Sequence, residues 1–160
     1  MPANDINKPV LLSNEDAIQL VRQFLPKEWK HLKSSEVDIK RMQCGFSNQV
    51  YICSIDKANK EPNKLIIRMY GGNMIDNEMK NTLMKLTINQ ELVLLGELGH
   101  RGLAPKVYGI FEEGRIEEFI GHHMMTEEEA CTPEIQRDMA KTIARFHSVD
   151  NVPLPKPGYA

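Results

Sequence analysis

The sequence is poor in cysteine and has no long apolar run. Its three cysteines, Cys44, Cys53 and Cys131, stand far apart among 160 residues and form no CxxC pair. An odd number at such spacings indicates neither a zinc site nor a disulfide framework, so we expect free thiols in a reducing compartment. No apolar stretch is long enough to cross a bilayer, and the first residues lack the pattern of a secretory signal. We therefore expect a cytoplasmic protein without membrane insertion.

An excess of either charge is also absent. The formal net charge is −2, which argues against bulk electrostatic binding to nucleic acid or to an anionic membrane. The hydrophobic fraction of 41% and the charged fraction of 26% are ordinary for a globular protein. A chain of this length can bury one hydrophobic core. We expect no nucleic-acid partner.

Apolar periodicity predicts an alternation of helices and strands. The first predicted helix follows Ser13, which is spaced from Asp16 as in a capping box. The last predicted helix begins at Thr132, with Pro133 at its first helical position. Between them the sequence predicts strands at 37–42, 50–55 and 64–70, a helix at 83–98 stopped by Gly99, and strands at 107–111 and 116–120. This is the order of a protein-kinase-like small lobe, although other α+β domains share it.

The turn between the first two strands is the first candidate site. Gly45 permits close approach of the backbone, while Ser47 and Asn48 add side-chain donors, so the turn could hold phosphate oxygens. An ordinary hairpin turn is the alternative.

Arg68 is the second candidate, because it interrupts an apolar strand where an unpaired charge is unfavourable. Glu91 borders the apolar face of the following helix, and a strand cation held by a helix carboxylate is the arrangement by which kinases reach nucleotide phosphates. We therefore predict an Arg68–Glu91 ion pair. Alternatively, Arg68 points to solvent from an edge strand.

The segment at 114–120 is the third candidate. In a kinase-like lobe the strand that leaves the sheet becomes the hinge whose backbone binds adenine, and Glu118 to Ile120 would take that place. A plain amphipathic strand is the alternative. His122 and His123 have no acidic or cysteine partner at ligand spacing, so we expect no metal site there.

Four segments together resemble the choline/ethanolamine kinase family. They are CGFSNQVY at 44–51, LIIRMYG at 65–71, LAPKVYGIF at 103–111 and GRIEEFI at 114–120. The family patterns read GGxSNxxx, LLRLYG, LGPKLYGxF and GRLEQFI, in the same order and at similar spacing. The resemblance covers about residues 37–147. The four motifs are closer to those of choline kinases than to those of dedicated ethanolamine kinases.

The resemblance implies a fold and a set of domains. The fold is α+β, a protein-kinase-like small lobe with a five-stranded antiparallel sheet, a packed helix and flanking helices. A helical segment at 1–36 precedes the lobe at 37–121, followed by a helix after the hinge at 122–150. A proline-rich linker at 151–160 would lead to a second, larger lobe.

The resemblance also implies roles for individual residues. The phosphate loop would consist of Gly45, Phe46, Ser47 and Asn48. Arg68 would contact ATP, Glu91 would orient Arg68, and Glu118 and Ile120 would frame the adenine. The implied activity is ATP-dependent phosphorylation of choline or ethanolamine by a homodimer, the first step of phosphatidylcholine or phosphatidylethanolamine synthesis.

The sequence departs from the family pattern in several places. Cys44 replaces the first loop glycine, and Glu118 replaces the hinge glutamine. The negative charge of Glu118 would disfavour ATP binding unless this side chain faces away from the nucleotide. His122, His123 and Met124 replace arginines that usually follow the hinge.

The largest departure is the absence of the HNDxxxxN and IDFE segments from this sequence. They supply the family's catalytic aspartate and Mg²⁺ ligands, so we assign no catalytic or metal residue here and expect the chain alone to be inactive. The alternatives are a non-catalytic interaction or dimerisation fragment, and a lobe of an aminoglycoside-phosphotransferase-type kinase.

Overall fold

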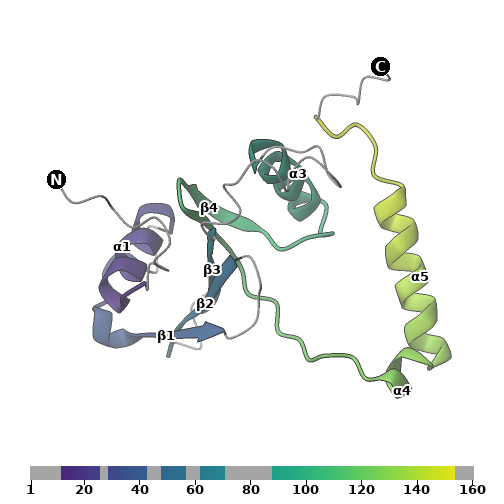
Figure 1. Ribbon diagram of the computed structural model, residues 1–160, viewed down its shortest axis with the longest axis horizontal. Coiled ribbons are helices and arrows are strands. Elements are labelled where there is room, and N and C mark those ends of the chain that lie inside the picture. The colour runs from purple at the N-terminus through teal and green to yellow at the C-terminus, as the bar shows by residue number, and fades with distance from the viewer. Residues whose placement is uncertain (1–11, 26–28, 43–47, 57–61, 71–87, 154–160) are drawn as a thin grey trace.

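A five-stranded antiparallel sheet forms the centre of the protein. The computed structural model describes residues 12–25, 29–42, 48–56, 62–70 and 88–153 (Figure 1). The strands lie in the order β1-β2-β3-β5-β4, with every neighbouring pair antiparallel. Their bounds are β1 Val37–Met42, β2 Asn48–Ile55, β3 Lys64–Tyr70, β4 Val107–Phe111 and β5 Gly114–Glu118. The predicted fold class and the order of the main elements are confirmed.

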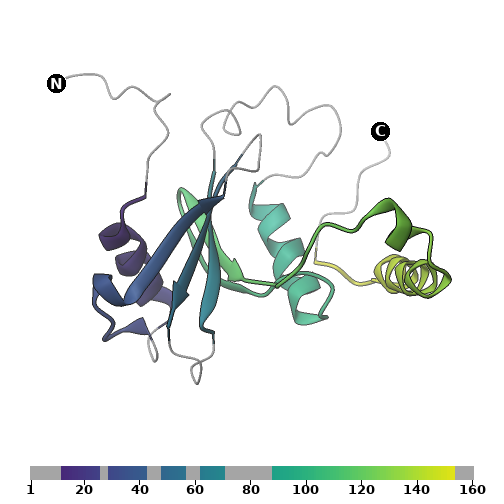
Figure 2. The same cartoon turned by 90° about the horizontal axis from the view of Figure 1, so that it is seen from below.

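Helix α1, Asn14–Phe24, covers one face of the sheet (Figure 2). The Ser13 hydroxyl caps it by accepting the N–H of Asp16, as the capping pattern predicts. Alternate strand residues point toward this helix, because successive side chains of a strand face opposite sides. Together they form the core: Ala17, Ile18, Val21, Trp29, Leu32, Val37, Tyr51, Cys53, Ile55, Leu65, Ile67, Met69 and Ile116.

Helix α3, Ile88–His100, lies on the opposite side of the sheet, as both views show (Figures 1 and 2). The helix does not stop at Gly99 as predicted. It ends at His100, and Gly102 provides the left-handed conformation beyond it, with a φ of 68°. Gly99 serves packing instead, since a Cβ there would lie 2.9 Å from the carbonyl oxygen of Pro105. Residues 83–87 of the predicted helix lie outside the described residues.

The remaining helices follow the sheet. Helix α5, Pro133–His147, begins with the predicted proline, and both views place it away from the sheet (Figures 1 and 2). Two short elements escaped the sequence prediction: η1, Ser34–Glu36, and α4, Glu127–Ala130, whose capping box joins Thr126 and Glu129. No helix in the described ranges is long and apolar enough to cross a membrane.

Candidate functional site

Arg68 lies within the apolar run of β3, and its side chain is 31% exposed. Its neighbours Ile67 and Met69 point into the core, so Arg68 points to the other face of the sheet. Its Nε donates to Oε1 of Glu117, on the neighbouring strand β5. The strand cation therefore has the carboxylate partner that burial demands, but this carboxylate comes from the sheet.

The predicted direct pair between Arg68 and Glu91 is wrong. Glu91, on α3, pairs with Arg115 of β5, with 3.5 Å between Oε1 and Nη1. Arg115 is the direct cross-strand partner of Arg68, so the two side chains share a face. Strand β5 lies between β3 and β4, and α3 packs against β4. The helix carboxylate therefore meets the arginine of the nearer strand first.

Glu117 joins the two ion pairs. Its side chain is 5% exposed, and its second oxygen, Oε2, lies 3.6 Å from Nε of Arg115. That Nε has no hydrogen-bond partner among the described residues, so the contact is one of charge alone. Arg68, Glu117, Arg115 and Glu91 thus form a continuous series of alternating charges, which we call the charge network.

Tyr70 supports the arginine at the centre of the charge network. The Tyr70 hydroxyl lies 3.5 Å from Nη1 of Arg115, and the guanidinium lies 5.8 Å from the centre of the tyrosine ring. Burial alone would lower the pKa of Arg115. The Tyr70 hydroxyl and the charges of Glu117 and Glu91 outweigh burial and raise this pKa. Arg115 is therefore a fixed cation.

Asn48 is the predicted phosphate-loop residue that the structure describes. It opens β2 opposite Tyr70, while Val50 lies opposite Arg68, so Asn48 and Arg68 share one face of the sheet. Its Oδ1 is buried and has no hydrogen-bond partner within the described ranges. This oxygen is an acceptor and calls for a ligand that donates a hydrogen bond, whereas only the side-chain NH₂ of Asn48 could donate to a phosphate oxygen. The rest of the predicted loop, at 45–47, lies outside the described residues.

The predicted hinge leaves the sheet at the end of β5. The carboxylate of Glu118 accepts the N–H of Lys106 at 3.1 Å, and the N–H of Glu118 donates to the carbonyl of Lys106 at 2.8 Å. The acidic side chain is thereby engaged by the backbone preceding β4. Ile120 is 51% exposed, and its carbonyl oxygen lies 2.8 Å from Nδ1 of His122.

No group of three or more metal-binding side chains occurs in the described part of the chain. His123 instead pairs with Glu129, with 3.2 Å between Nε2 and Oε1. The backbone N–H of Thr126 and the His123 ring lower the pKa of Glu129. This cluster is a surface helix cap.

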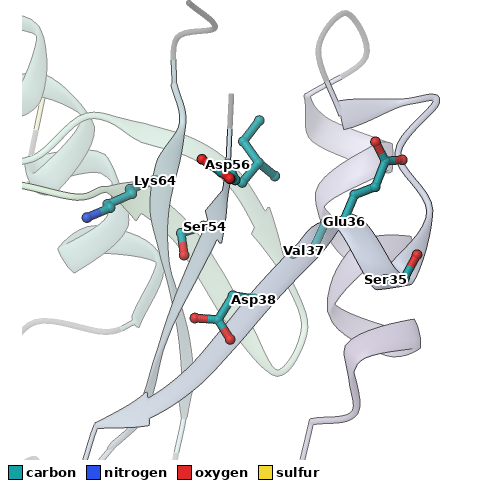
Figure 3. A pocket seen from close by; sticks show the side chains of 8 residues that line it. Ser35, Glu36, Val37, Asp38, Ser54, Asp56 and Lys64 are labelled. Atoms are coloured by element: carbon teal, nitrogen blue, oxygen red, sulfur yellow. The ribbon is translucent and has the colours of Figure 1, made fainter. Parts of the chain in front are cut away.

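A hollow of about 570 Å³ lies at the strand ends remote from Asn48 (Figure 3). Asp38, Ser54 and Lys64 stand on adjacent strands along its wall, as their register and the close-up both show. None of the predicted site residues lines this hollow. It is therefore separate from the charge network.

Sequence reasoning overlooked Arg115 and Glu117 as site residues. The signal was present, because the two alternate with core-facing Ile116 and so fall on one face of a buried strand. A cation and a carboxylate spaced two apart in such a strand must find partners on that same face. The register that places Arg115 opposite Arg68 is a long-range property.

The sheet, with α3 beside its charged face, defines a small lobe of the protein-kinase type. A family model described as choline/ethanolamine kinase matches residues 39–158. The chain belongs to the choline/ethanolamine kinase family.

Curated relatives of this chain are longer than it is. Choline kinase alpha of Mus musculus is 29% identical over an alignment of 143 residues, which covers 80% of this chain and 32% of that protein. Choline kinase A2 of Caenorhabditis elegans is 31% identical over an alignment of 146 residues, which covers 89% of this chain and 32% of that protein. The crystal structure of choline kinase from Cryptosporidium parvum Iowa II superposes with a TM-score of 0.70 at 24% identity, covering 91% of this chain and 38% of that one. The chain thus spans about a third of the curated relatives it matches.

Proposed function

We propose that this chain is the ATP-binding small lobe of a kinase that phosphorylates choline or ethanolamine. The observation that carries the proposal is Arg68, a partly exposed cation held within an apolar strand, on the same face as Asn48 of the predicted phosphate loop. An arginine in this position can grip two phosphate oxygens at once. Family membership supports the nucleotide as the ligand.

The proposed site extends along one face of the sheet. Gly45, Phe46, Ser47 and Asn48 form the phosphate loop, and Arg68 binds phosphate. Glu118 and Ile120 frame the adenine where the chain leaves β5. The hydrogen bond from the backbone N–H of Lys106 to the Glu118 carboxylate supports this role, because it holds the negative charge near β4.

Transfer of the phosphoryl group needs residues outside this sequence. ATP supplies the phosphoryl group, and Mg²⁺ neutralises the charge that develops on it. We propose that a second lobe, joined through the proline-rich segment at 151–160, supplies the Mg²⁺ ligands, the aspartate that orients the alcohol, and the alcohol pocket. Choline is the alcohol we favour, because the sequence motifs are closer to those of choline kinases than to those of dedicated ethanolamine kinases. We also propose a cytoplasmic location, which agrees with the free Cys53 and Cys131 thiols because a reducing compartment keeps thiols unpaired. We further propose that the kinase is a homodimer.

The test has two parts. Calorimetric titration with ATP and Mg²⁺ should show binding by the 160-residue chain, and a coupled assay with choline should show no turnover. A version extended through a relative's second lobe should turn over and serves as the positive control. Turnover by the short chain after rigorous removal of host kinases would refute its proposed dependence on a second lobe.

A non-catalytic interaction fragment is the second candidate function. The observation that favours it is the exposed apolar side of α5, where Met139, Ile143 and Phe146 are 44%, 51% and 50% exposed. If this function is the true one, the chain will associate with a full-length kinase subunit and will not bind ATP.

A further inference from the structure

We propose that Glu117 and Arg115 are positioning residues that determine where the guanidinium of Arg68 points, and that Glu91 acts on Arg68 only through them. The consequence for a nucleotide rests on the proposed function, since it takes Arg68 as the phosphate-binding group. The positioning itself can be measured without any nucleotide.

The first argument is the opposition of two like charges. Arg68 and Arg115 are direct partners across β3 and β5, and like charges in that relation destabilise a sheet. Glu117 lies on the same face, is buried, and offers one carboxylate oxygen to each arginine. Because both oxygens belong to one rigid group, a displacement of Glu117 toward one arginine withdraws it from the other.

The second argument is the difference in freedom between the two arginines. The Arg115 side chain is 9% exposed and is held by Tyr70, Glu91 and Glu117. The Arg68 side chain is 31% exposed, and its contact with Glu117 uses Nε. Arg115 is therefore the anchor, and Arg68 is the member that can offer its terminal nitrogens to a phosphate while Nε stays with Glu117.

The third argument is the weak position of Glu91. Its side chain is 49% exposed and approaches Arg115 at 3.5 Å, so water screens the interaction. A shift of α3 changes the Glu91–Arg115 contact first, and it reaches Arg68 only by way of Glu117. The order of influence on Arg68 is thus Glu117, then Arg115, then Glu91.

Nuclear magnetic resonance of the arginine Nε–H groups tests this order in the nucleotide-free chain. Glu117→Gln should shift the Arg68 signal and speed its exchange with water. Arg115→Lys should do the same, although Arg68 and Arg115 share no hydrogen bond, because lysine cannot hold Glu117 and Glu91 in the same fork geometry. Glu91→Gln should change the Arg115 signal much more than that of Arg68.

Arg101 provides the internal reference for these spectra. Its Nε donates to Glu97 at 2.7 Å, away from the charge network, so its signal should stay unchanged in all three variants. A change in the Arg101 signal would reveal general unfolding. In that event Arg115→Gln, which preserves the planar end of the side chain without charge, replaces Arg115→Lys and must shift the Arg68 signal.

Titration with ATP and Mg²⁺ carries the inference to the ligand. Glu117→Gln and Arg115→Lys should each weaken binding by about tenfold, and Glu91→Gln by less than about threefold. If Glu91→Gln moves the Arg68 signal most, or Arg115→Lys leaves it unmoved, the positioning proposal is overturned. If the Arg68 signal responds as described but ATP binds nowhere on the chain, the positioning stands and the proposed function fails.

Discussion

Arg68 and Arg115 lie directly opposite each other on neighbouring strands, and the buried carboxylate of Glu117 contacts both. Two cations in this relation would repel each other without the carboxylate. The β3 cation and the α3 carboxylate are thereby connected through β5, whereas the sequence predicts a direct pair between strand and helix. The stability of the sheet and the direction of Arg68 therefore depend on the same side chain.

Removal of the Glu117 charge should destabilise the fold far more than removal of the Glu91 charge. Glu117→Gln leaves Arg115 buried beside Arg68 and should lower the free energy of unfolding by on the order of 3 kcal/mol. Glu91→Gln removes a half-exposed partner and should lower it by less than about 1 kcal/mol. Urea denaturation followed by the fluorescence of the buried Trp29 measures both. Equal losses would contradict the central place of Glu117.

Gly114 should tolerate no side chain, because β3 passes immediately beside it. A Cβ at this position would lie 2.2 Å from the carbonyl oxygen of Arg68, so Gly114→Ala must separate β3 from β5. We expect a loss of about 1–3 kcal/mol, as for other overpacked sites. Gly96, within α3, has nothing within 4 Å of its Cβ position and is the matched control. Gly96→Ala should raise stability by up to about 1 kcal/mol, and a loss at both sites would count against the packing argument.

Two free thiols should differ sharply in reactivity. Burial, aided by the charge of Asp38, raises the pKa of Cys53 from 9.0 to about 12, whereas Cys131 is exposed. Since the thiolate is the reactive form, a thiol reagent at pH 8 should label Cys131 quickly and Cys53 only after unfolding. The measurement is made in a Cys44→Ser background, because Cys44 lies outside the described residues. Two rapidly labelled thiols in the folded protein would be the contrary result.

The same shift predicts a dependence of stability on pH. Below about pH 9 both the folded and the unfolded protein keep the Cys53 proton, so its contribution is fully present. Between about pH 9 and about 12 only the unfolded chain loses the proton, and the folded state loses stability as pH rises. In Cys53→Ala, which cannot ionise, this part of the alkaline loss should be absent from urea denaturation curves.

The apolar side of α5 should make the chain self-associate. Large apolar surfaces are unusual on monomers, and Ile143 lies at the centre of this one, lining a shallow hollow with Met139. Light scattering at low micromolar concentration should show oligomers of the wild-type chain, and the Ile143→Lys variant should be monomeric. Ala144→Lys adds the same charge to the other side of the helix and should leave the oligomers intact. A clean wild-type monomer that binds no hydrophobic dye would contradict this expectation.

Local sequence patterns predicted the sheet well. In β2 and β3 core-facing residues alternate with outward ones, as in Tyr51, Cys53 and Ile55 of β2, and such a period follows directly from strand geometry. The end of α3 was misplaced because Gly99 and Gly102 look alike in sequence. Only the path of the following chain shows that Gly102 adopts a positive φ and that Gly99 packs against Pro105.

The pairing within the candidate site was beyond local patterns. The sequence shows that Arg68 needs a partner, and it predicts Glu91 of the following helix as that partner. The choice between Glu91 and Glu117 depends on the register of β3 with β5 and on the distance of α3 from each strand. Those are properties of long-range packing, which no periodicity encodes.

Calorimetric titration of the wild-type chain and of Arg68→Ala with ATP and Mg²⁺ is the most direct test of the account. The 31% exposure of Arg68 predicts that the variant still folds, which the fluorescence of Trp29 checks before each titration. The account predicts that the wild-type chain binds ATP and that Arg68→Ala weakens binding by about tenfold or more, as loss of a charge-assisted phosphate contact should. Equal ATP affinity in the two folded proteins would contradict it.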